Sequence, residues 1–467
     1  MKFLMPRSPA APATALAGLF ALLAACANQP AAEPAGIAGV ESESASLAEP
    51  VAEPMAPADT YFTIAVLPDT QNYLDYTHQK AEGFPFEASE MFLEQMQYVA
   101  DNLESAGGEI AFVSSLGDVW QHQTKTMDPE HAARGFKAVP NPIMDSHFAP
   151  TEKVKTVEMP KAHEGFSLIA GRTPFSVVPG NHDYDAMWTD SKFPPAAKGP
   201  ADIDPTDLKT SLGVLHPGGL ENFRSVFGAD TDFFKDKPWY VASHDGGADS
   251  AQIFEAGGYR FLHIGLQFDP PNASLEWAAE VIAQYKGLPT IISTHDYMTK
   301  EGERLPNPIV DGHAVDPLNN SPEMVWEKLI SQQDQIFLVL CGHEHGQAWR
   351  VDENAHGHKV WQVLADYQDR GQTAIDAGVK SAWPVGIGDG WMRLMSFDFG
   401  AEVPVLTVDT YSTYYRKDSR DTADYAVWYK AAEKPNLSDE AFHDEDDYTL
   451  SLEDFRARFD ETGRVKN

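Results

Sequence analysis

The sequence predicts an α/β protein in which buried β-strands alternate with amphipathic helices. The chain has 467 residues, and 43% of them are hydrophobic, which is enough for a sizeable core. Short apolar runs with β-branched residues recur along the chain, as expected for buried strands. Apolar residues at helical spacing lie between the first two of these runs.

Predicted strands and helices follow one another along most of the chain. Strands are expected at 61–67, 110–116, 173–178, 250–254, 260–266, 290–293, 336–341, 348–351, 359–365, 391–397 and 405–411. Helices are expected at 88–105, 274–285 and 322–331. The first strand, helix and second strand form a βαβ unit, whose two strand-end loops emerge on one edge of the sheet. This places Asp69 and Asp118 side by side.

Two stretches lack a long periodic element. The connection 119–172 is expected to contain helical pieces and an irregular insertion at 139–160. The stretch 185–249 is rich in Pro, Gly, Asp and aromatic residues, and we interpret it as an excursion from the sheet on the side of the strand-end loops.

The sequence pattern at the N-terminus predicts an export signal. Lys2 and Arg7 precede an apolar run at 15–25 that is too short to span a membrane. The run ends in Leu-Ala-Ala-Cys26, which resembles a bacterial lipobox. This predicts a signal peptide at 1–25 and a lipidated Cys26, with ordinary cleavage near Ala25 as the alternative. We expect an exported lipoprotein held by its anchor in the outer membrane, facing the periplasm or the cell surface.

Composition defines the other segments and excludes one class of partner. Residues 26–59 are rich in Ala, Pro and Glu and predict a disordered tether. A folded domain is expected at 60–416, followed by an acidic extension at 417–467, whose charged run 443–447 we expect to be solvated. The net charge of −35 repels polyanions, so no nucleic acid duplex is expected as a partner. No protein partner is predicted.

Cys341, the second of two cysteines, is expected to be a small buried hydrophobe.

Polar residues with metal-ligand chemistry follow five of the predicted strands. These residues are Asp69 and Gln71, Asp118, Asn181 and His182, His295, and His343 and His345. A Gly-His-x-His turn alone is a weak signal, but five such loops are hard to obtain by accident. Mixed carboxylate, amide and imidazole ligands suit first-row ions such as Mn, Fe or Zn.

This ordered series resembles the calcineurin-like metallophosphoesterase superfamily. The family pattern Asp-x-His, Gly-Asp, Gly-Asn-His-Asp/Glu, His, Gly-His-x-His is matched here by 69–71, 117–118, 180–183, 295 and 342–345. The segments 364–368 and 390–394 are similar to those of exported bacterial members. The resemblance implies a four-layer α/β/β/α sandwich of two mixed β-sheets flanked by helices.

The resemblance also implies a dinuclear centre that hydrolyses phosphomonoesters or phosphodiesters. One ion would be held by Asp69, Gln71, Asp118 and His345, and the other by Asp118, Asn181, His295 and His343. Two divalent or mixed-valence ions are implied, Mn, Fe or Zn, with Ca as a further candidate. A hydroxide bridging the ions would attack the phosphorus of a small phosphoester, while His182 assists the leaving group and Asp183 orients its ring.

The sequence departs from the family pattern at Gln71, where histidine is usual. An amide oxygen is a weaker donor than imidazole, so we expect weaker binding or a harder ion at this position. A non-catalytic, metal-stabilised surface or binding lipoprotein with a degenerate first site is therefore the alternative function. For His122, a role at the site and an ordinary loop histidine both remain open.

Overall fold

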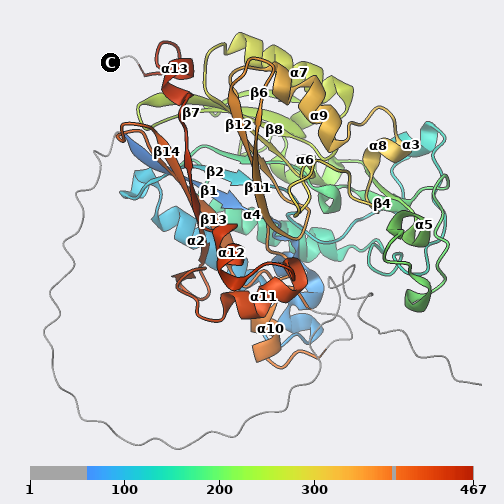
Figure 1. Ribbon diagram of the computed structural model, residues 1–467. Helices are drawn as coiled ribbons and strands as arrows, with labels where there is room; N and C mark the ends of the chain where they lie inside the picture. Colours follow the sequence, from blue (N-terminus) through green and yellow to red (C-terminus); the bar gives the residue numbers. More distant parts are fainter. Residues whose placement is uncertain (1–59, 381–384, 466–467) are drawn as a thin grey trace, which may run out of the picture.

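The computed structural model describes residues 60–380 and 385–465, which build two mixed β-sheets packed face to face (Figure 1). The predicted signal peptide, Cys26 and the whole of the predicted tether at 26–59 lie outside the described residues. Within the described ranges, none of the helices combines the length and apolar character that a bilayer crossing requires.

The first sheet contains the predicted βαβ unit. Its strands, in spatial order, are β15 (Lys417–Asp418), β14 (Val405–Ser412), β13 (Trp391–Asp398), β1 (Tyr61–Leu67), β2 (Ile110–Ser115) and β3 (Phe175–Val177), with β16 (Tyr448–Ser451) also paired to β14. β1, β2 and β3 are parallel, whereas β13 and β14 are antiparallel. The loops after β1 and β2 meet as predicted, because the amide of Thr70 donates to the carbonyl of Asp118 at 3.0 Å.

The second sheet has a parallel centre and antiparallel edges. Its strands, in spatial order, are β11 (Gly346–Glu353), β12 (Lys359–Asp366), β10 (Ile336–Cys341), β9 (Thr290–Thr294), β8 (Tyr259–Leu266), β7 (Asp249–Ala256) and β6 (Tyr240–His244). β12, β10, β9 and β8 run parallel, so their carboxyl ends share one edge of the sheet.

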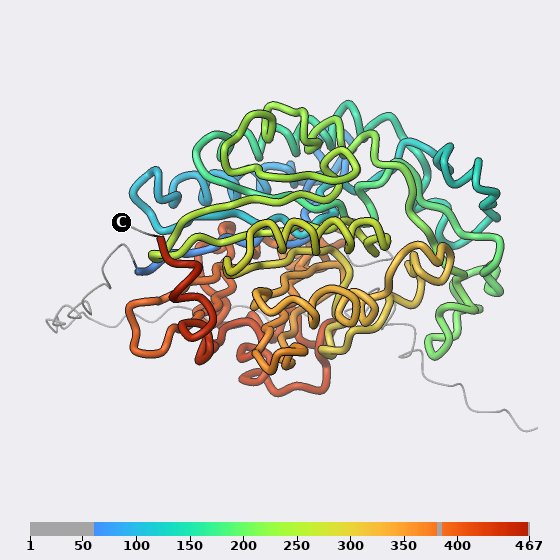
Figure 2. The backbone as a smooth tube through the Cα atoms, turned by 90° about the horizontal axis from the view of Figure 1, so that it is seen from above, coloured from blue at the N-terminus to red at the C-terminus, as the bar shows by residue number. Residues whose placement is uncertain are grey.

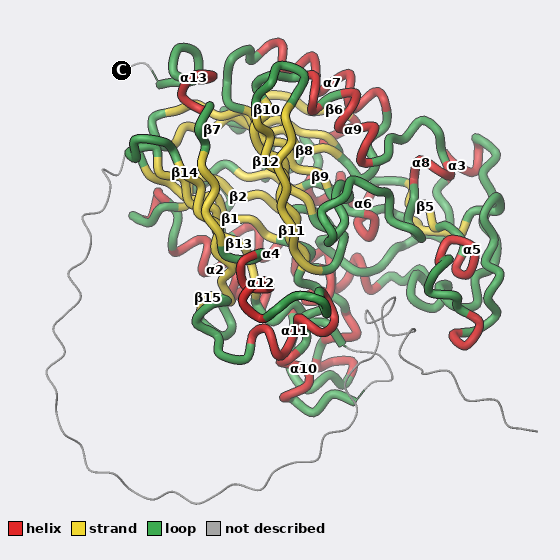
Figure 3. The backbone as a smooth tube through the Cα atoms, viewed as in Figure 1, coloured by secondary structure: helices red, strands yellow, loops and turns green. Residues whose placement is uncertain are grey.

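Apolar side chains fill the space between the sheets and cover both outer faces. Phe62, Ile64 and Val66 alternate along β1 and share one buried cluster with residues of the second sheet. The outer face of the first sheet packs on α2 (Ser89–Asp101) and α4 (Met159–Ser167), and that of the second on α7 (Asn272–Gln284) and α9 (Pro322–Lys328). Figure 3 shows the strands in the middle with helices on both sides, and Figure 2 shows from above that the N-terminal half of the described chain lies mostly on one side and the C-terminal part mostly on the other. The fold is therefore a layered α/β sandwich.

At one side of the sandwich, the excursion 185–249 contains a separate two-stranded ribbon and two short helices, and two more short helices, one from the connection 119–172 and one from the loop before α9, lie beside it (Figure 3). The ribbon pairs β4 (Ala186–Thr189) with β5 (Leu215–Gly218). The short helices are α3 (Pro129–Ala133), α5 (Leu208–Leu212), α6 (Glu221–Phe227) and α8 (Gly312–Val315). The remaining helices are α1 (Gln71–Leu74), α10 (Gln372–Asp376), α11 (Tyr425–Glu433), α12 (Asp439–Asp444) and α13 (Phe455–Phe459).

The acidic C-terminal segment is built into the first sheet through β15 and β16. The expectation that its charged run is solvated is wrong for Asp446, which is fully buried. Its carboxylate accepts from Nη2 of the buried Arg393 at 3.0 Å and from Nη2 of Arg370 at 3.4 Å. A buried guanidinium group needs a carboxylate partner, and Asp446 supplies it to Arg393, whereas Arg370 also pairs with Glu433 at 2.8 Å.

Replacing Asp446 with alanine should destabilise the fold strongly. Asp446→Ala leaves Arg393 without an ion-pair partner, and we expect a loss on the order of 3–5 kcal/mol in the free energy of unfolding. Asp444, an exposed neighbour that pairs with the exposed Arg420, is the matched control, and Asp444→Ala should cost less than about 1 kcal/mol. Urea unfolding followed by circular dichroism measures both, and equal midpoints for the two variants would contradict this account.

Candidate metal centre

Six loops bring polar side chains together at the carboxyl ends of buried strands. They follow β1, β2, β3, β9, β10 and β12 and carry Asp69, Asp118, Asn181, His295, His343 and Asp366. All six side chains are buried. The carboxyl edge of a sheet is where α/β proteins commonly place ligands, because the loops there are free to vary.

Close backbone packing holds these loops in place. Asp118 and His343 have left-handed backbone conformations, with φ values of 48° and 70°. Gly180 allows the loop after β3 to approach the loop after β2, since a Cβ atom there would lie 2.2 Å from Oδ1 of Asp118. Gly342 does the same after β10, where a Cβ would lie 2.2 Å from Oδ1 of Asp69.

Three predicted ligands converge on Nε2 of a fourth, His295. Oδ1 of Asn181 lies 3.1 Å from this nitrogen, Nδ1 of His343 lies 3.2 Å from it, and Oδ2 of Asp118 lies 3.3 Å from it. Atoms that bind one ion tetrahedrally at about 2.1 Å are about 3.4 Å apart. Asp118, His295 and His343 form a buried group that could hold a metal ion.

The other predicted set is more open. Asp69 Oδ2 lies 3.8 Å from Nε2 of His295, and the amide of Gln71 donates to Oδ2 of Asp118 at 3.1 Å. His345 does not join this group directly, because the amide of Gln368 hydrogen-bonds both Gln71 and Nε2 of His345. The predicted ligands Gln71 and His345 are thus linked through the side-chain amide of Gln368, which was not among the predicted site residues.

Three residues at the end of β12 and in the loop that follows it were missed as parts of the site. Asp366 Oδ2 lies 3.9 Å from Nε2 of His345, and Oδ2 of Asp369 lies 2.7 Å from its Nδ1. Gln368 is the third. The sequence pattern that indicated the other site residues is present here too, because Asp366 is a polar residue at the end of a buried strand that is parallel to β10.

The electrostatics of the cluster favour a cation. Among the described residues, the ion-pair partners of Asp69, Asp118 and Asp366 are histidines only. Burial raises the pKa of Asp366 to about 7, and burial together with Asp366 raises the pKa of Asp69 well above its ordinary value. Burial also opposes a charge on His295, but Asp118 and Asp69 outweigh it and raise the pKa of that ring. A divalent cation would relieve this excess of negative charge and displace the proton from His295.

Orphaned polar atoms show that the residues fit such an ion. Nε2 of His343, Oε1 of Gln71 and Oδ2 of Asp366 are buried and have no hydrogen-bond partner within the described part of the chain. Nδ1 of His295 is held by the carbonyl of Leu116 at 2.8 Å, which leaves Nε2 directed at the other ligands. Buried polar atoms without partners are costly, and a bound cation would satisfy them.

His182 and Asp183 lie beside this group in different roles. Nδ1 of His182 lies 2.7 Å from the carbonyl of Gln121, and its Nε2 lies 3.9 Å from Oδ2 of Asp118. The prediction that Asp183 orients the ring of His182 is wrong. The Asp183 carboxylate instead accepts from the amides of Val119 at 2.9 Å and Gly180 at 2.9 Å, so it braces the two turns against each other.

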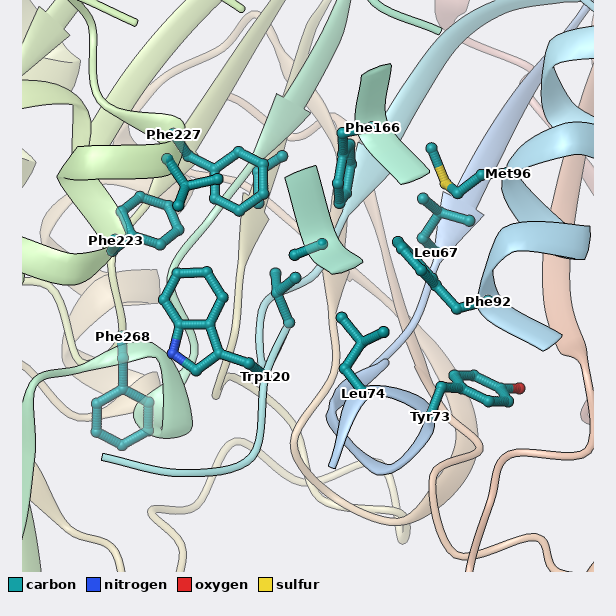
Figure 4. Close-up of a cluster of buried hydrophobic side chains, with 14 of the residues drawn as sticks. Leu67, Tyr73, Leu74, Phe92, Met96, Trp120, Phe166, Phe223, Phe227 and Phe268 are labelled. Carbon is teal, nitrogen blue, oxygen red and sulfur yellow. The ribbon is translucent and has the colours of Figure 1, made fainter. Parts of the chain in front are cut away.

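An aromatic cluster packs against the turn after β2. Trp120 is fully buried, and its ring centroid lies 6.2 Å from that of Phe227 and 6.4 Å from that of Phe223 (Figure 4). Phe268 lies on the other side, and its ring is 5.7 Å from that of His343. This rigid apolar base fixes Asp118, which is two residues from Trp120.

Two further residues fall outside the group of ligands. Nδ1 of His122 lies 2.8 Å from Oε1 of the buried Glu158, so this histidine is part of a separate ion pair. Cys341 is fully buried in an apolar cluster, as predicted.

Enlarging Gly342 should weaken metal binding. Gly342→Ala pushes a methyl group against Asp69, and we expect the affinity for Mn²⁺ to fall roughly 10-fold or more, the scale seen when the support of a ligand is lost. Gly199, which has open space around its Cβ position and no positive φ, is the control. Isothermal titration with Mn²⁺ measures both variants, and unchanged affinity in Gly342→Ala would show that Asp69 does not bind the ion.

Comparison with known proteins gives one distant similarity. No family model matches the chain. It is 21% identical over 383 residues to an uncharacterized protein of Bacillus subtilis (strain 168), YvnB, and the aligned part covers 80% of this chain. That part is 22% of the relative, so the chain spans about a fifth of the length of the curated protein it matches.

Proposed function

We propose that this protein is a metal-dependent phosphoesterase with a dinuclear centre at Asp118. The observation that carries the proposal is the convergence of Asp118, Asn181 and His343 on one nitrogen of His295, all at 3.1–3.3 Å. Four separate loops supply these atoms, and chance packing does not explain why each offers a metal-ligand group.

The second ion would lie on the side of Asp69. Asp69, Gln71 and His345 remain its proposed ligands, and Asp366 joins them because its orphaned oxygen faces His345. A half turn of the Gln71 amide would direct its Oε1 toward this ion, since the two ends of an amide group have the same shape. Asp118 would be shared, because a carboxylate has two oxygens to offer.

Bound ions would supply Lewis-acid charge to a phosphoryl group and an activated water for attack on phosphorus. The chain itself contributes a histidine next to the reaction site. Nδ1 of His182 faces a carbonyl oxygen and therefore carries a proton, which fixes the tautomer when the ring is neutral. Nε2 is then directed toward Asp118, where a proton on it can be donated to the leaving oxygen. Asp183 is a positioning residue that fixes the turn carrying His182.

The architecture is consistent with the calcineurin-like family. Two mixed sheets with helices on both outer faces agree with a four-layer sandwich, and the site residues follow strands in the order of the family motifs. We extend the proposal to an exported, lipid-anchored protein that acts on small phosphomonoesters or phosphodiesters. The predicted export signal and the lipobox-like Cys26 support the proposal of export and lipid anchoring.

Turnover of p-nitrophenyl phosphate and bis-p-nitrophenyl phosphate tests the activity. With Mn²⁺, Fe²⁺ or Zn²⁺ present we expect hydrolysis that a chelator abolishes and added metal restores. Asp118→Asn should lower kcat/KM at least ~100-fold because it weakens the shared ligand, and His182→Ala should lower kcat roughly 100-fold or more through loss of the proton donor. The matched controls are Asp101→Asn and His163→Ala, which alter exposed residues and should leave turnover unchanged.

Two results would contradict the proposal. Turnover that persists after complete removal of metal would exclude metal-dependent catalysis. Bound ions that raise the melting temperature, with no hydrolysis of either ester, would instead favour the non-catalytic metal-stabilised module.

A further inference from the structure

A second buried histidine cluster lies where the excursion meets α3 and the segment after α8, apart from the centre at Asp118. His131 comes from α3, His216 from β5, and Asp316 directly follows α8. These segments are distant in sequence, and none of the three residues belongs to the strand-end loops of the proposed dinuclear centre. His216 and Asp316 are almost fully buried, with exposed fractions of 1% and 2%, and His131 is also buried.

The spacing of the three side chains matches that of metal ligands. The two Nε2 atoms of His131 and His216 lie 3.2 Å apart, and Oδ2 of Asp316 lies 3.8 Å from Nε2 of His131. One ligand atom from each residue lies within 4.8 Å of the others. Tetrahedral ligands of Zn²⁺ are about 3.4 Å apart, so small side-chain adjustments would complete the geometry.

The partner of His131 directs its free nitrogen into the cluster. Nδ1 of His131 lies 2.9 Å from Oδ2 of Asp128, which accepts hydrogen bonds only, so the proton of the neutral ring is on Nδ1. Nε2 then presents a lone pair to His216. A carboxylate behind a histidine in this way is the usual support of a zinc ligand.

His216 also has the properties of a ligand. Burial lowers its pKa to about 3, so the ring is neutral, which is the form that binds metals. Its Nδ1 has no hydrogen-bond partner among the described residues, and Nε2 makes the polar contact with His131. The Trp188 ring centroid lies 5.2 Å from that of each histidine, so aromatic packing fixes both rings.

Arg134 occupies part of the position that a cation would take. Its Nη2 lies 2.5 Å from Oδ2 of Asp316 and orients that carboxylate. The Arg134 side chain is about one-third exposed and stacks over Phe136, so it can turn toward solvent when a cation arrives. Without a cation, the same residues form a hydrogen-bonded network in which His216 donates to His131.

We infer that His131, His216 and Asp316 bind one divalent cation of the Zn²⁺ class and thereby join α3, the β4–β5 ribbon and the segment after α8. Two imidazoles and one carboxylate suit Zn²⁺, and they leave a fourth position toward a cavity of about 490 Å³ that all three residues line. Phe268, next to His343, lines the same cavity, so the cation would stabilise a wall that borders the proposed dinuclear centre. The inference does not depend on the proposed phosphoesterase activity.

Counting zinc ions in matched variants tests the inference. The full chain is stripped with a chelator, saturated with ZnCl₂, separated from free metal and measured for Zn²⁺ per chain by mass spectrometry. We compare wild type with His216→Gln, and His263→Gln serves as the control. His263 is an equally buried histidine with a similarly lowered pKa that hydrogen-bonds Gln252 and Ser293 outside both clusters.

Wild type and His263→Gln should each hold one more Zn²⁺ per chain than His216→Gln, whatever the occupancy at Asp118. Equal counts in all three would overturn the inference and leave the cluster as a hydrogen-bonded network. If His216→Gln does not fold, Asp316→Asn provides the same comparison while keeping the shape of the side chain. Anomalous diffraction at the zinc edge from wild-type crystals needs no variant. A peak between the two Nε2 atoms supports the site, and its absence at saturating zinc excludes it.

Discussion

The buried carboxylate of Asp118 is the constraint on which the strand-end region depends. It lies among His182, His295 and His343, and no lysine or arginine pairs with it in the described residues. Burial opposes its ionisation, but the histidines hold its pKa below the ordinary value. A buried carboxylate that stays charged requires positive charge beside it. The histidines provide only part of this charge, because His295 also pairs with Asp69. Divalent cations would resolve this imbalance and would provide partners for the buried polar atoms of these loops.

The fold brings these loops together through its strand ends and through two glycines. Parallel strands from two sheets end near one another, and close approach at Gly180 and Gly342 lets loops meet that are far apart in the sequence. Trp120 and its aromatic neighbours form a rigid base, and Asp183 ties the turns after β2 and β3 together. The excursion is built differently, because it has little sheet structure of its own, and the cluster of His131, His216 and Asp316 would give it a cross-link.

Local patterns in the sequence predicted eleven of the strands and most of the candidate ligands, whereas β4, β5, β6, β15 and β16 were not predicted. The apolar run before Asp118 and the Gly-Asn-His-Asp turn carry their signals within a few residues. Partners that depend on long-range packing were not predictable in this way. The place of Gln368 between Gln71 and His345, the burial of Asp446 against Arg393 and the meeting of His131 with His216 all require the tertiary fold. The role of Asp183 was inferred from its position next to His182, whereas backbone amides are its actual partners.

The most direct test is anomalous diffraction from wild-type crystals soaked in Mn²⁺. The account predicts two peaks about 3.5–4 Å apart, the spacing of dinuclear centres. One peak should lie within bonding distance of His295 and His343, the other near Asp69, and the Asp118 carboxylate between them. Absence of a peak within bonding distance of Asp118 and His295 at saturating Mn²⁺ would contradict the account.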